Sequence, residues 1–294
     1  MSTQAAAADP TFRLPLGSWV DTAVDTITDT FSVLFDAIKA VLLGAYEGLE
    51  GVMTGPPSWV VASVLVALAV IAKGWRLGVG ALVGFVVIVG VEQWDNAMAT
   101  LALVLVASVI ALAIAIPLGV LTARNDAVSR AVRPVLDFMQ TMPAFVYLIP
   151  TVVIFFTGAV PGIVATILFA LAPGVRFTEL GIRQVDHEVV EAGQAFGATP
   201  GRILRQVQLP LALPTIMAGI NQVIMLALSM VVISGLVGAE GLGRDVVSAL
   251  SRVNVALGFE AGLAVVILAI YLDRMTSALA DKAPVSRALR TTSA

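Results

Sequence analysis

Seven long apolar stretches limit what this chain can fold into. A transmembrane helix needs ~20 apolar residues and satisfies its backbone hydrogen bonds within itself, so runs of this kind are typical of membrane spans. The sequence therefore predicts an all-α integral membrane protein with about seven transmembrane helices. The stretches lie near residues 58–73, 75–91, 96–122, 138–158, 161–175, 212–237 and 257–280.

Three of these stretches, 58–73, 75–91 and 161–175, are short for a span. Each could extend into its flanking residues, or the first two could form a tight hairpin around residues 73–76. Tryptophans at the span boundaries are expected to lie in the headgroup region, where amphipathic rings anchor: Trp59, Trp75 and Trp94. Prolines within or beside spans are expected to kink helices: Pro117, Pro143, Pro150 and Pro173.

Composition supports the membrane assignment and excludes several kinds of chemistry. Of 294 residues, 59% are hydrophobic and 13% charged, and the mean hydropathy is +0.97. The absence of cysteine excludes disulfides and thiolate chemistry. His187 is the one histidine, which we interpret as a solvated loop residue, and no lysine follows a glycine, so a phosphate-binding loop is absent. We expect no catalytic residue, no metal site and no cofactor bound by this chain.

Residues 1–57 precede the first span and contain one amphipathic helical pattern, from about residue 20 to residue 49. Because no basic region precedes an apolar core at the start, we expect no cleaved signal peptide. Helices on membrane surfaces are usually rich in Lys and Arg, whereas this one carries Lys39 alone. The helix could pack on the outer face of the protein or lie flat at the interface, and the sequence leaves both open.

A charged, glycine-punctuated island, residues 186–210, interrupts the apolar sequence and predicts two short helices. Asp186 can cap the first helix, from about Glu188 to Phe196, and Gly197 suits the position just past its end. Thr199 and Pro200 are suited to start the second helix, because Thr caps and Pro fits the first position. Pro210 and Pro214 are expected to close it and to open the next apolar segment.

The first helix of the island carries an apolar ridge flanked by charge. Such a helix suits the groove of a partner protein, although a solvated loop without a partner explains the charge equally well. The ridge consists of Val189, Val190, Ala192, Ala195 and Phe196.

The island resembles the EAA loop of permease subunits of ABC-type importers. Glu191, Ala192, Gly197, Leu209 and Pro210 fall on the spacing of that motif, with Gly193 in its third position and Val207 where Ile is usual. In that family the loop is the coupling helix, which sits in a cleft of the ATPase subunit. The resemblance implies that ATP and Mg are held by a separate ATPase.

Longer runs at 139–150, 228–233, 238–244 and 257–274 are similar to permeases of glycine betaine/proline betaine importers. The resemblance implies a type I ABC importer permease core preceded by an amphipathic N-terminal helix. We divide the chain accordingly into an acidic extracytoplasmic tail, two accessory spans, the permease core with its coupling loop 186–210, and a cytoplasmic tail. The respective ranges are 1–57, 58–95, 96–281 and 282–294.

By the same resemblance, a binding protein delivers a betaine, a related quaternary ammonium compound or proline to two permease copies. We expect a homodimer with two ATPase subunits in the lipid bilayer, and no nucleic acid partner. Coupling is expected at Glu191, Ala192, Gly193, Gly197, Leu209 and Pro210. The translocation path is expected to include Met139, Gln140, Met142, Tyr147, Asn221, Met225, Ser229 and Met230.

The distribution of Lys and Arg residues indicates how the chain is oriented in the membrane. With the island placed in the cytoplasm, 13 of the 17 Lys and Arg residues fall on that side, as the positive-inside rule requires. This predicts a cell-membrane protein with its N-terminus outside and its C-terminus in the cytoplasm.

Two other kinds of function remain: an ion-coupled carrier or channel that acts without an ATPase, and a membrane scaffold that transports nothing. A carrier usually places an ionisable residue near the bilayer midplane. Glu260, the nearest candidate, lies at the start of the last span and is expected to be an interfacial carboxylate. The permease hypothesis alone accounts for the missing phosphate loop, the charged island and the basic asymmetry together.

Overall fold

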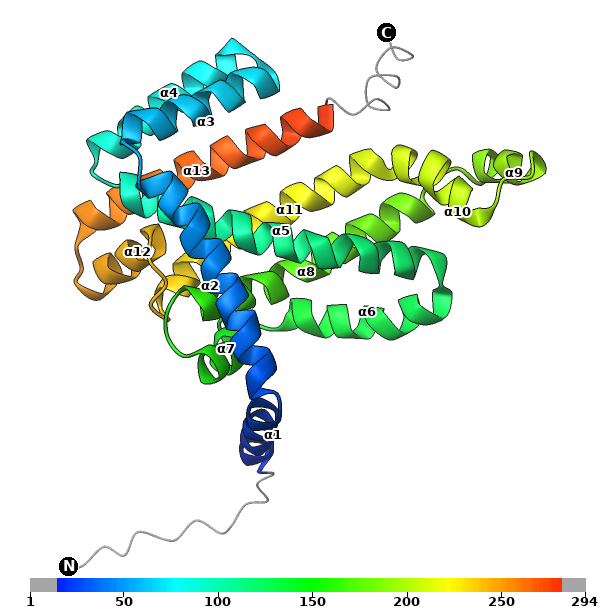
Figure 1. Ribbon diagram of the computed structural model, residues 1–294, viewed down its shortest axis with the longest axis horizontal. Coiled ribbons are helices and arrows are strands. Elements are labelled where there is room, and N and C mark those ends of the chain that lie inside the picture. The colour runs from blue at the N-terminus through cyan, green and yellow to red at the C-terminus, as the bar shows by residue number, and fades with distance from the viewer. Residues whose placement is uncertain (1–14, 282–294) are drawn as a thin grey trace, which may run out of the picture.

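The computed structural model describes residues 15–281, and all regular structure among them is helical. Four helical segments there are long and apolar enough to cross a membrane. They are α5 (Trp94–Arg124), α8 (Ala159–Arg183), α11 (Leu209–Gly235) with the turns before it, and α13 (Val255–Asp281). Figure 1 shows these helices running along the long axis of the molecule. The prediction of an all-α membrane protein is confirmed.

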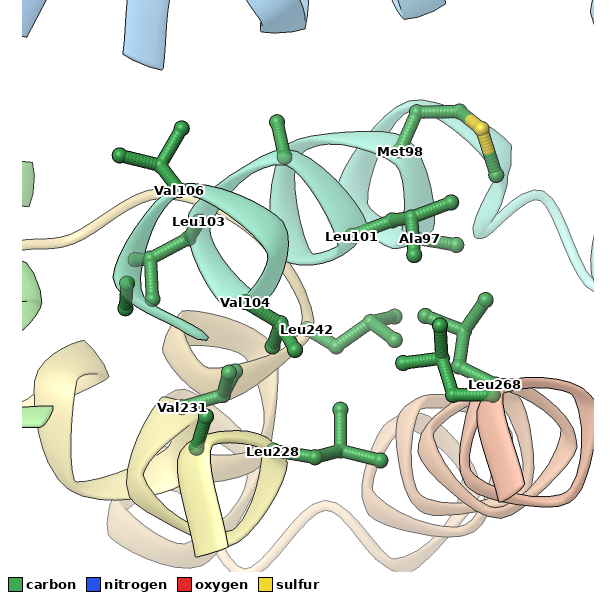
Figure 2. Packing of buried hydrophobic residues seen from close by; sticks show 14 of the residues in the cluster. Ala97, Met98, Leu101, Leu103, Val104, Val106, Leu228, Val231, Leu242 and Leu268 are labelled. Atoms are coloured by element: carbon green, nitrogen blue, oxygen red, sulfur yellow. The ribbon is translucent and has the colours of Figure 1, made fainter. Parts of the chain in front are cut away.

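Helices α5, α8 and α11 pack on one another and form the centre of the bundle. Glycines allow this close approach: a Cβ added to Gly119 of α5 would lie 2.7 Å from Val175 O of α8. α12 (Leu242–Ser251) and α13 complete the core. Figure 2 shows side chains from α5, α11, α12 and α13 meeting in one buried cluster.

The fourth apolar stretch is bent instead of straight. Residues 138–158 take in the last residues of α6 (Asp126–Thr141), the turn η1 (Ala144–Tyr147) and α7 (Leu148–Phe155), with a bend of 109° between α6 and the helical segment after it. The expected kink at Pro143 is confirmed, because a residue before proline avoids helical geometry and Met142 is extended at ψ 133°. By contrast, α5 and α8 continue through Pro117 and Pro173.

The first two apolar stretches form the tight hairpin that was one of the two alternatives. α3 (Ser58–Lys73) and α4 (Trp75–Gly90) meet at Gly74, whose φ is 91°. The hairpin lies beside α13 (Figure 1), and the Tyr271 hydroxyl donates a hydrogen bond to Leu65 O at 3.0 Å.

Two of the three boundary tryptophans are exposed as expected, and the third is not. Trp59 is 71% and Trp75 69% exposed, whereas Trp94 is 7% exposed. The Trp94 ring packs against Phe85 of α4, with centroids 6.0 Å apart. The headgroup assignment of Trp94 is therefore wrong, because the hairpin covers the start of α5.

The N-terminal amphipathic segment forms two helices, α1 (Leu16–Thr30) and α2 (Ser32–Thr54). α2 crosses the bundle (Figure 1), packs against α5 and buries Leu42 and Tyr46. Packing on the protein, one of the two predicted alternatives, is thus confirmed for α2. α1 buries no residue, so its place on the protein or at the interface stays a prediction.

Polar contacts fasten α12 to the start of α5, at the end of the bundle away from α9. Asp245 Oδ2 accepts hydrogen bonds from Asn96 Nδ2 at 2.7 Å and from Gln93 Nε2 at 3.1 Å. Thr100 Oγ1 accepts from the Leu242 N–H at 2.9 Å. The Thr100 contact satisfies the first N–H of α12, which lacks a partner within the helix, and the Asp245 contacts tie its side chain to α5.

Candidate functional site

The charged island folds as short helices at one end of the bundle (Figure 1). The first, α9 (His187–Ala195), begins as predicted at Asp186, whose Oδ1 accepts a hydrogen bond from the Glu188 N–H at 2.9 Å. A side-chain acceptor at this position satisfies a donor that the helix itself leaves free. The local sequence therefore fixes where α9 starts.

α9 ends at the predicted glycine. Gly197 has a φ of 76°, a left-handed conformation that glycine adopts without strain. Its N–H bonds to Gln194 O at 2.8 Å, and the Ala198 N–H reaches back to Gly193 O at 3.1 Å. These bonds satisfy carbonyls at the end of α9 and reverse the chain toward Pro200.

The second helix is longer than predicted. α10 (Pro200–Ile203) passes through a π-helical turn, η2 (Leu204–Gln208), into α11, so one helical rod runs from Pro200 to Gly235. We expected Pro210 and Pro214 to close this helix and to open the next apolar segment. The helix continues through both prolines, so the first part is wrong, whereas Pro210 does lie in the first turn of α11.

The π-helical turn explains why Pro210 does not end the helix. In this turn the Leu209 N–H bonds to Leu204 O, five residues back. The shift in hydrogen-bond register comes directly before Pro210, which has no N–H to donate. Pro210 therefore lies in the first turn of α11, where a missing donor costs little.

One face of the island packs on the bundle. Ile203 and Leu204 are buried, and Leu204 joins a cluster with Ile182 of α8 and Ile216 of α11. Val190, expected on the outer ridge, packs inward against this cluster. A Cβ on Gly193 would lie 3.4 Å from Ile203, an ordinary contact, so the glycine in the third motif position leaves the packing of α9 intact.

The opposite face of the island is apolar at its tip and is not covered by the rest of the described chain. Phe196 is 92% and Val189 43% exposed. The second half of the island, with Arg124 at the end of α5, lines a cleft of about 540 Å³ to which Arg202 and Arg205 contribute. An island with an exposed aromatic ring and a basic cleft is suited to a partner with an apolar pocket and acidic side chains.

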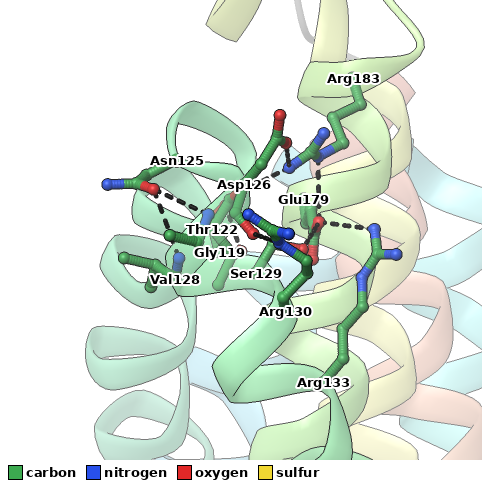
Figure 3. A network of polar contacts seen from close by, with 11 residues as sticks. Gly119, Thr122, Asn125, Asp126, Val128, Ser129, Arg130, Arg133, Glu179 and Arg183 are labelled. Carbon is green, nitrogen blue, oxygen red and sulfur yellow. Dashed lines mark hydrogen bonds and ion pairs between the residues drawn. The ribbon is translucent and has the colours of Figure 1, made fainter.

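A buried carboxylate that the sequence analysis did not predict lies just before the island. Glu179 of α8 is 5% exposed. Its Oε1 accepts hydrogen bonds from Ser129 Oγ at 2.7 Å and Arg133 Nη2 at 2.9 Å, and it forms an ion pair with Arg183 Nε at 3.0 Å (Figure 3). Charged and hydrogen-bonded partners of this kind are what a buried carboxylate needs.

Arg183 extends this network to the turn between α5 and α6. Its Nη2 donates to Asp126 Oδ1 at 2.7 Å and to Thr122 O at 2.9 Å. The hydrogen bond and the charge of Arg183 hold the pKa of the Asp126 carboxyl below its usual range. The network thus links α5, α6 and α8 within a few residues of α9.

The residues expected along the path do not form one group. Met139, Met142, Tyr147 and Met230 come together in a small cluster under η1, where the Tyr147 hydroxyl donates to Met139 O. Gln140 and Ser229 are exposed, and Ser229 bonds to Met225 O in its own helix.

Asn221 lies apart from this cluster and joins α11 to α13. Its Nδ2 donates to Asp273 Oδ1 at 3.0 Å, and its Oδ1 accepts from Thr276 Oγ1 at 2.6 Å. Such contacts hold transmembrane helices together.

Within residues 15–281, no group of three or more His, Asp or Glu side chains is placed to hold a metal ion. His187 is exposed at the start of α9, as a solvated loop histidine would be.

A bundle of apolar spans with a short helical island at one end is the architecture of a multi-pass membrane protein, and it agrees with the permease resemblance of the sequence. The family model described as "Binding-protein-dependent transport system inner membrane component" matches residues 115–283, more than half of the chain. The chain belongs to this family. It is a membrane-spanning permease subunit of an ABC importer, and such permeases work with a separate ATPase and a binding protein.

Relatives match over most of the chain. The glycine betaine/carnitine transport permease protein GbuB of Listeria monocytogenes is 48% identical over 92% of this chain and 97% of its own length. The glycine betaine transport system permease protein OpuAB of Bacillus subtilis is 46% identical over 90% of this chain and 94% of its own length. The glycine betaine/proline betaine transport system permease protein ProW of Escherichia coli is 44% identical over 90% of this chain and 75% of its own length.

Among solved structures, the fold is similar to a chain of the MetNI methionine ABC transporter in inward-facing conformations. The TM-score is 0.57 at 26% identity, over 62% of this chain and 91% of that chain. The expected type I ABC importer permease fold is confirmed.

Proposed function

We propose that this permease carries glycine betaine or a closely related quaternary ammonium solute into the cell. Relatives with 44–48% identity are named for transport of glycine betaine, and two of those names add carnitine or proline betaine. A trimethylamine N-oxide permease, TmoV of Ruegeria pomeroyi, is 37% identical over 88% of this chain. These solutes share a compact, methylated nitrogen.

The observation that carries the coupling part of this proposal is the exposed tip of the island. Phe196 is 92% exposed, on an island that also contributes two arginines to a cleft, and we assign its ring to a pocket on the ATPase. Glu191 and Ala192 lie on the solvent side of α9, where the ATPase would contact them. Gly193 faces Ile203 within the island and Gly197 ends α9, while Leu209 and Pro210 connect the island to α11.

The assembly proposed is two identical permeases with two ATPase subunits, which bind the ATP and Mg, and a binding protein on the opposite side. Met139, Gln140, Met142, Tyr147, Met225, Ser229 and Met230 are proposed to line or border the path, with Asn221 beside it. The distribution of Lys and Arg supports an extracytoplasmic N-terminus and a cytoplasmic C-terminus and island.

The test is uptake of labelled glycine betaine into vesicles that hold the chain with its ATPase. ATP is inside and the binding protein outside, each omitted in turn. We expect uptake only with both. The variant Phe196→Ala should lower ATP-dependent uptake roughly tenfold or more, as loss of a central aromatic contact does in other interfaces.

The control is Phe31→Ala, which removes a ring that is 51% exposed and lies outside the family match. It should leave uptake within about twofold, a change of under ~0.5 kcal/mol. Uptake without ATP would instead indicate a carrier, and equal loss in both variants would remove the special role of Phe196. ATP-dependent uptake of another solute alone would retain the mechanism and reject the substrate.

A further inference from the structure

A groove between α4 and α13 combines an apolar wall with a basic mouth. Its volume is about 770 Å³, within the range of ligand sites. Lys73, Arg76 and Arg274 lie at its mouth, and no acidic residue lines it. Most of the remaining lining is aliphatic or aromatic, including Leu263, Ile267 and Tyr271.

Two glycines of α4 shape the groove. A Cβ on Gly84 would lie 2.7 Å from Cγ2 of Ile267, so α4 and α13 touch at this level. One turn nearer the mouth, a Cβ on Gly80 would meet nothing within 4 Å. The helices therefore separate toward the basic residues and leave a slot that is narrow at its apolar end.

The mouth lies at the level of the membrane surface. Trp75, 69% exposed, stands next to Arg76 in the α3–α4 turn, and exposed tryptophans of spans are typical of the headgroup region. Figure 1 shows this turn and the C-terminal end of α13 directed toward the end of the bundle that carries α9. The apolar part of the groove therefore extends from the headgroups into the hydrocarbon region.

We propose that this groove binds one anionic phospholipid. Its acyl chains would lie along the apolar wall past Gly80, and its phosphate would face the two arginines and Lys73. Arginine binds phosphate through paired hydrogen bonds, and a basic pocket between membrane helices attracts anionic headgroups. The Arg274 side chain is 59% exposed, with Nε 3.9 Å from the neighbouring Asp273, so it is accessible to a phosphate.

The charge of the groove argues against two other occupants, the C-terminal tail of this chain and a second copy of it. Residues 282–294, which follow α13, contain one Lys, two Arg and no acid, so this tail has the same sign as the mouth. A second copy joined by two-fold symmetry through this face would bring the two basic mouths together. A lipid anion has the charge opposite to that of this basic mouth.

The test measures lipid binding to the full chain by native mass spectrometry, with phosphatidylglycerol and phosphatidylcholine of identical acyl chains. We expect the first phosphatidylglycerol to bind roughly tenfold more tightly than phosphatidylcholine. Arg76→Gln/Arg274→Gln should abolish this preference, a loss of about tenfold or more for two cations near a membrane surface. Equal binding of both lipids to the unchanged chain would overturn the proposal.

Matched variants separate the groove from general charge. Arg130→Gln/Arg252→Gln removes two exposed arginines outside the groove and should change the preference less than about twofold, since charge effects fade within a Debye length. If this control lost the preference for phosphatidylglycerol equally, the preference would reflect the overall charge of the protein and not the groove. Gly80→Leu keeps all three cations but fills the slot, and it should weaken phosphatidylglycerol binding as much as the arginine variant. If Gly80→Leu left phosphatidylglycerol binding unchanged, the groove would not be the lipid site.

The chain contains no cysteine, so a single Gly80→Cys variant reports on a second copy. Under oxidation in vesicles it should remain unlinked, because a lipid fills the slot. An efficient disulfide between two chains would assign the groove to the dimer interface and overturn the lipid site. Thermal unfolding of each variant is the control for whether the variant still folds.

Discussion

The central helices and the α3–α4 hairpin are both apolar, yet they are built differently. In the centre, glycines mark places where backbones touch: a Cβ on Gly243 would lie 2.1 Å from Val231 O. In the hairpin, the nearest atom to a Cβ on Gly78 or Gly84 would be a side-chain methyl, of Val70 or Ile267. A Cβ on Gly80 or Gly90 would meet nothing within 4 Å. The centre is therefore a closely packed unit, whereas the hairpin adds a membrane-facing surface to it.

The largest effect is expected where backbones touch. Gly243→Ala forces α11 and α12 apart, because the clash is with a backbone carbonyl that cannot rotate away. We expect a loss of about 3 kcal/mol or more in unfolding free energy, at the upper end for overpacking, measured by thermal unfolding in detergent. Unchanged stability would contradict the close contact of α11 with α12.

A smaller effect is expected in the polar network of α8. Glu179→Gln keeps the size of the side chain but removes the charge that two arginines share. Because the arginine side chains are 58% and 33% exposed, we expect a loss of about 2 kcal/mol. The control is Asp137→Asn, which breaks the exposed pair with Arg176 and should cost less than ~0.5 kcal/mol. Equal losses would mean that burial of Glu179 adds nothing.

A still smaller loss is expected where the hairpin is attached. Tyr271→Phe removes the hydrogen bond to Leu65 O but keeps the ring against Phe85. The expected cost is ~0.6 kcal/mol, the average for side-chain hydrogen bonds between membrane helices. Hydrogen exchange should rise in α3 and α4 and stay constant in α8. A rise throughout the bundle would show that the hairpin and the centre unfold as one unit.

The smallest effect is expected in the open part of the hairpin. Gly80→Ala adds a methyl group that meets no neighbour and favours helix, so stability should stay equal or rise by about 0.5 kcal/mol. The same thermal unfolding measurement compares it directly with Gly243→Ala. A marked loss would show that α4 is packed as closely as the centre.

Features set by neighbouring residues were predictable from sequence. Asp186 caps α9 and Gly197 ends it, because each effect needs only a few residues. The spans and the break at Pro143 likewise follow from local composition and backbone sterics.

Features that depend on packing or on hydrogen-bond register were not predictable. Glu179 meets Ser129, which is 50 positions away, and nothing near either residue indicates the contact. Trp94 is buried because the hairpin folds over it. Pro210 resembles a helix end, but a π-helical turn accommodates it, and this turn has no clear local signature.

The rod that begins at Pro200 has a mechanical consequence. Its 36 residues span about 54 Å at 1.5 Å per residue. If the rod pivots near its middle by roughly 10°, each end moves by about 5 Å, the rise of one helical turn. A modest displacement of the island is then delivered undiminished, and in the opposite direction, to the far end of the rod.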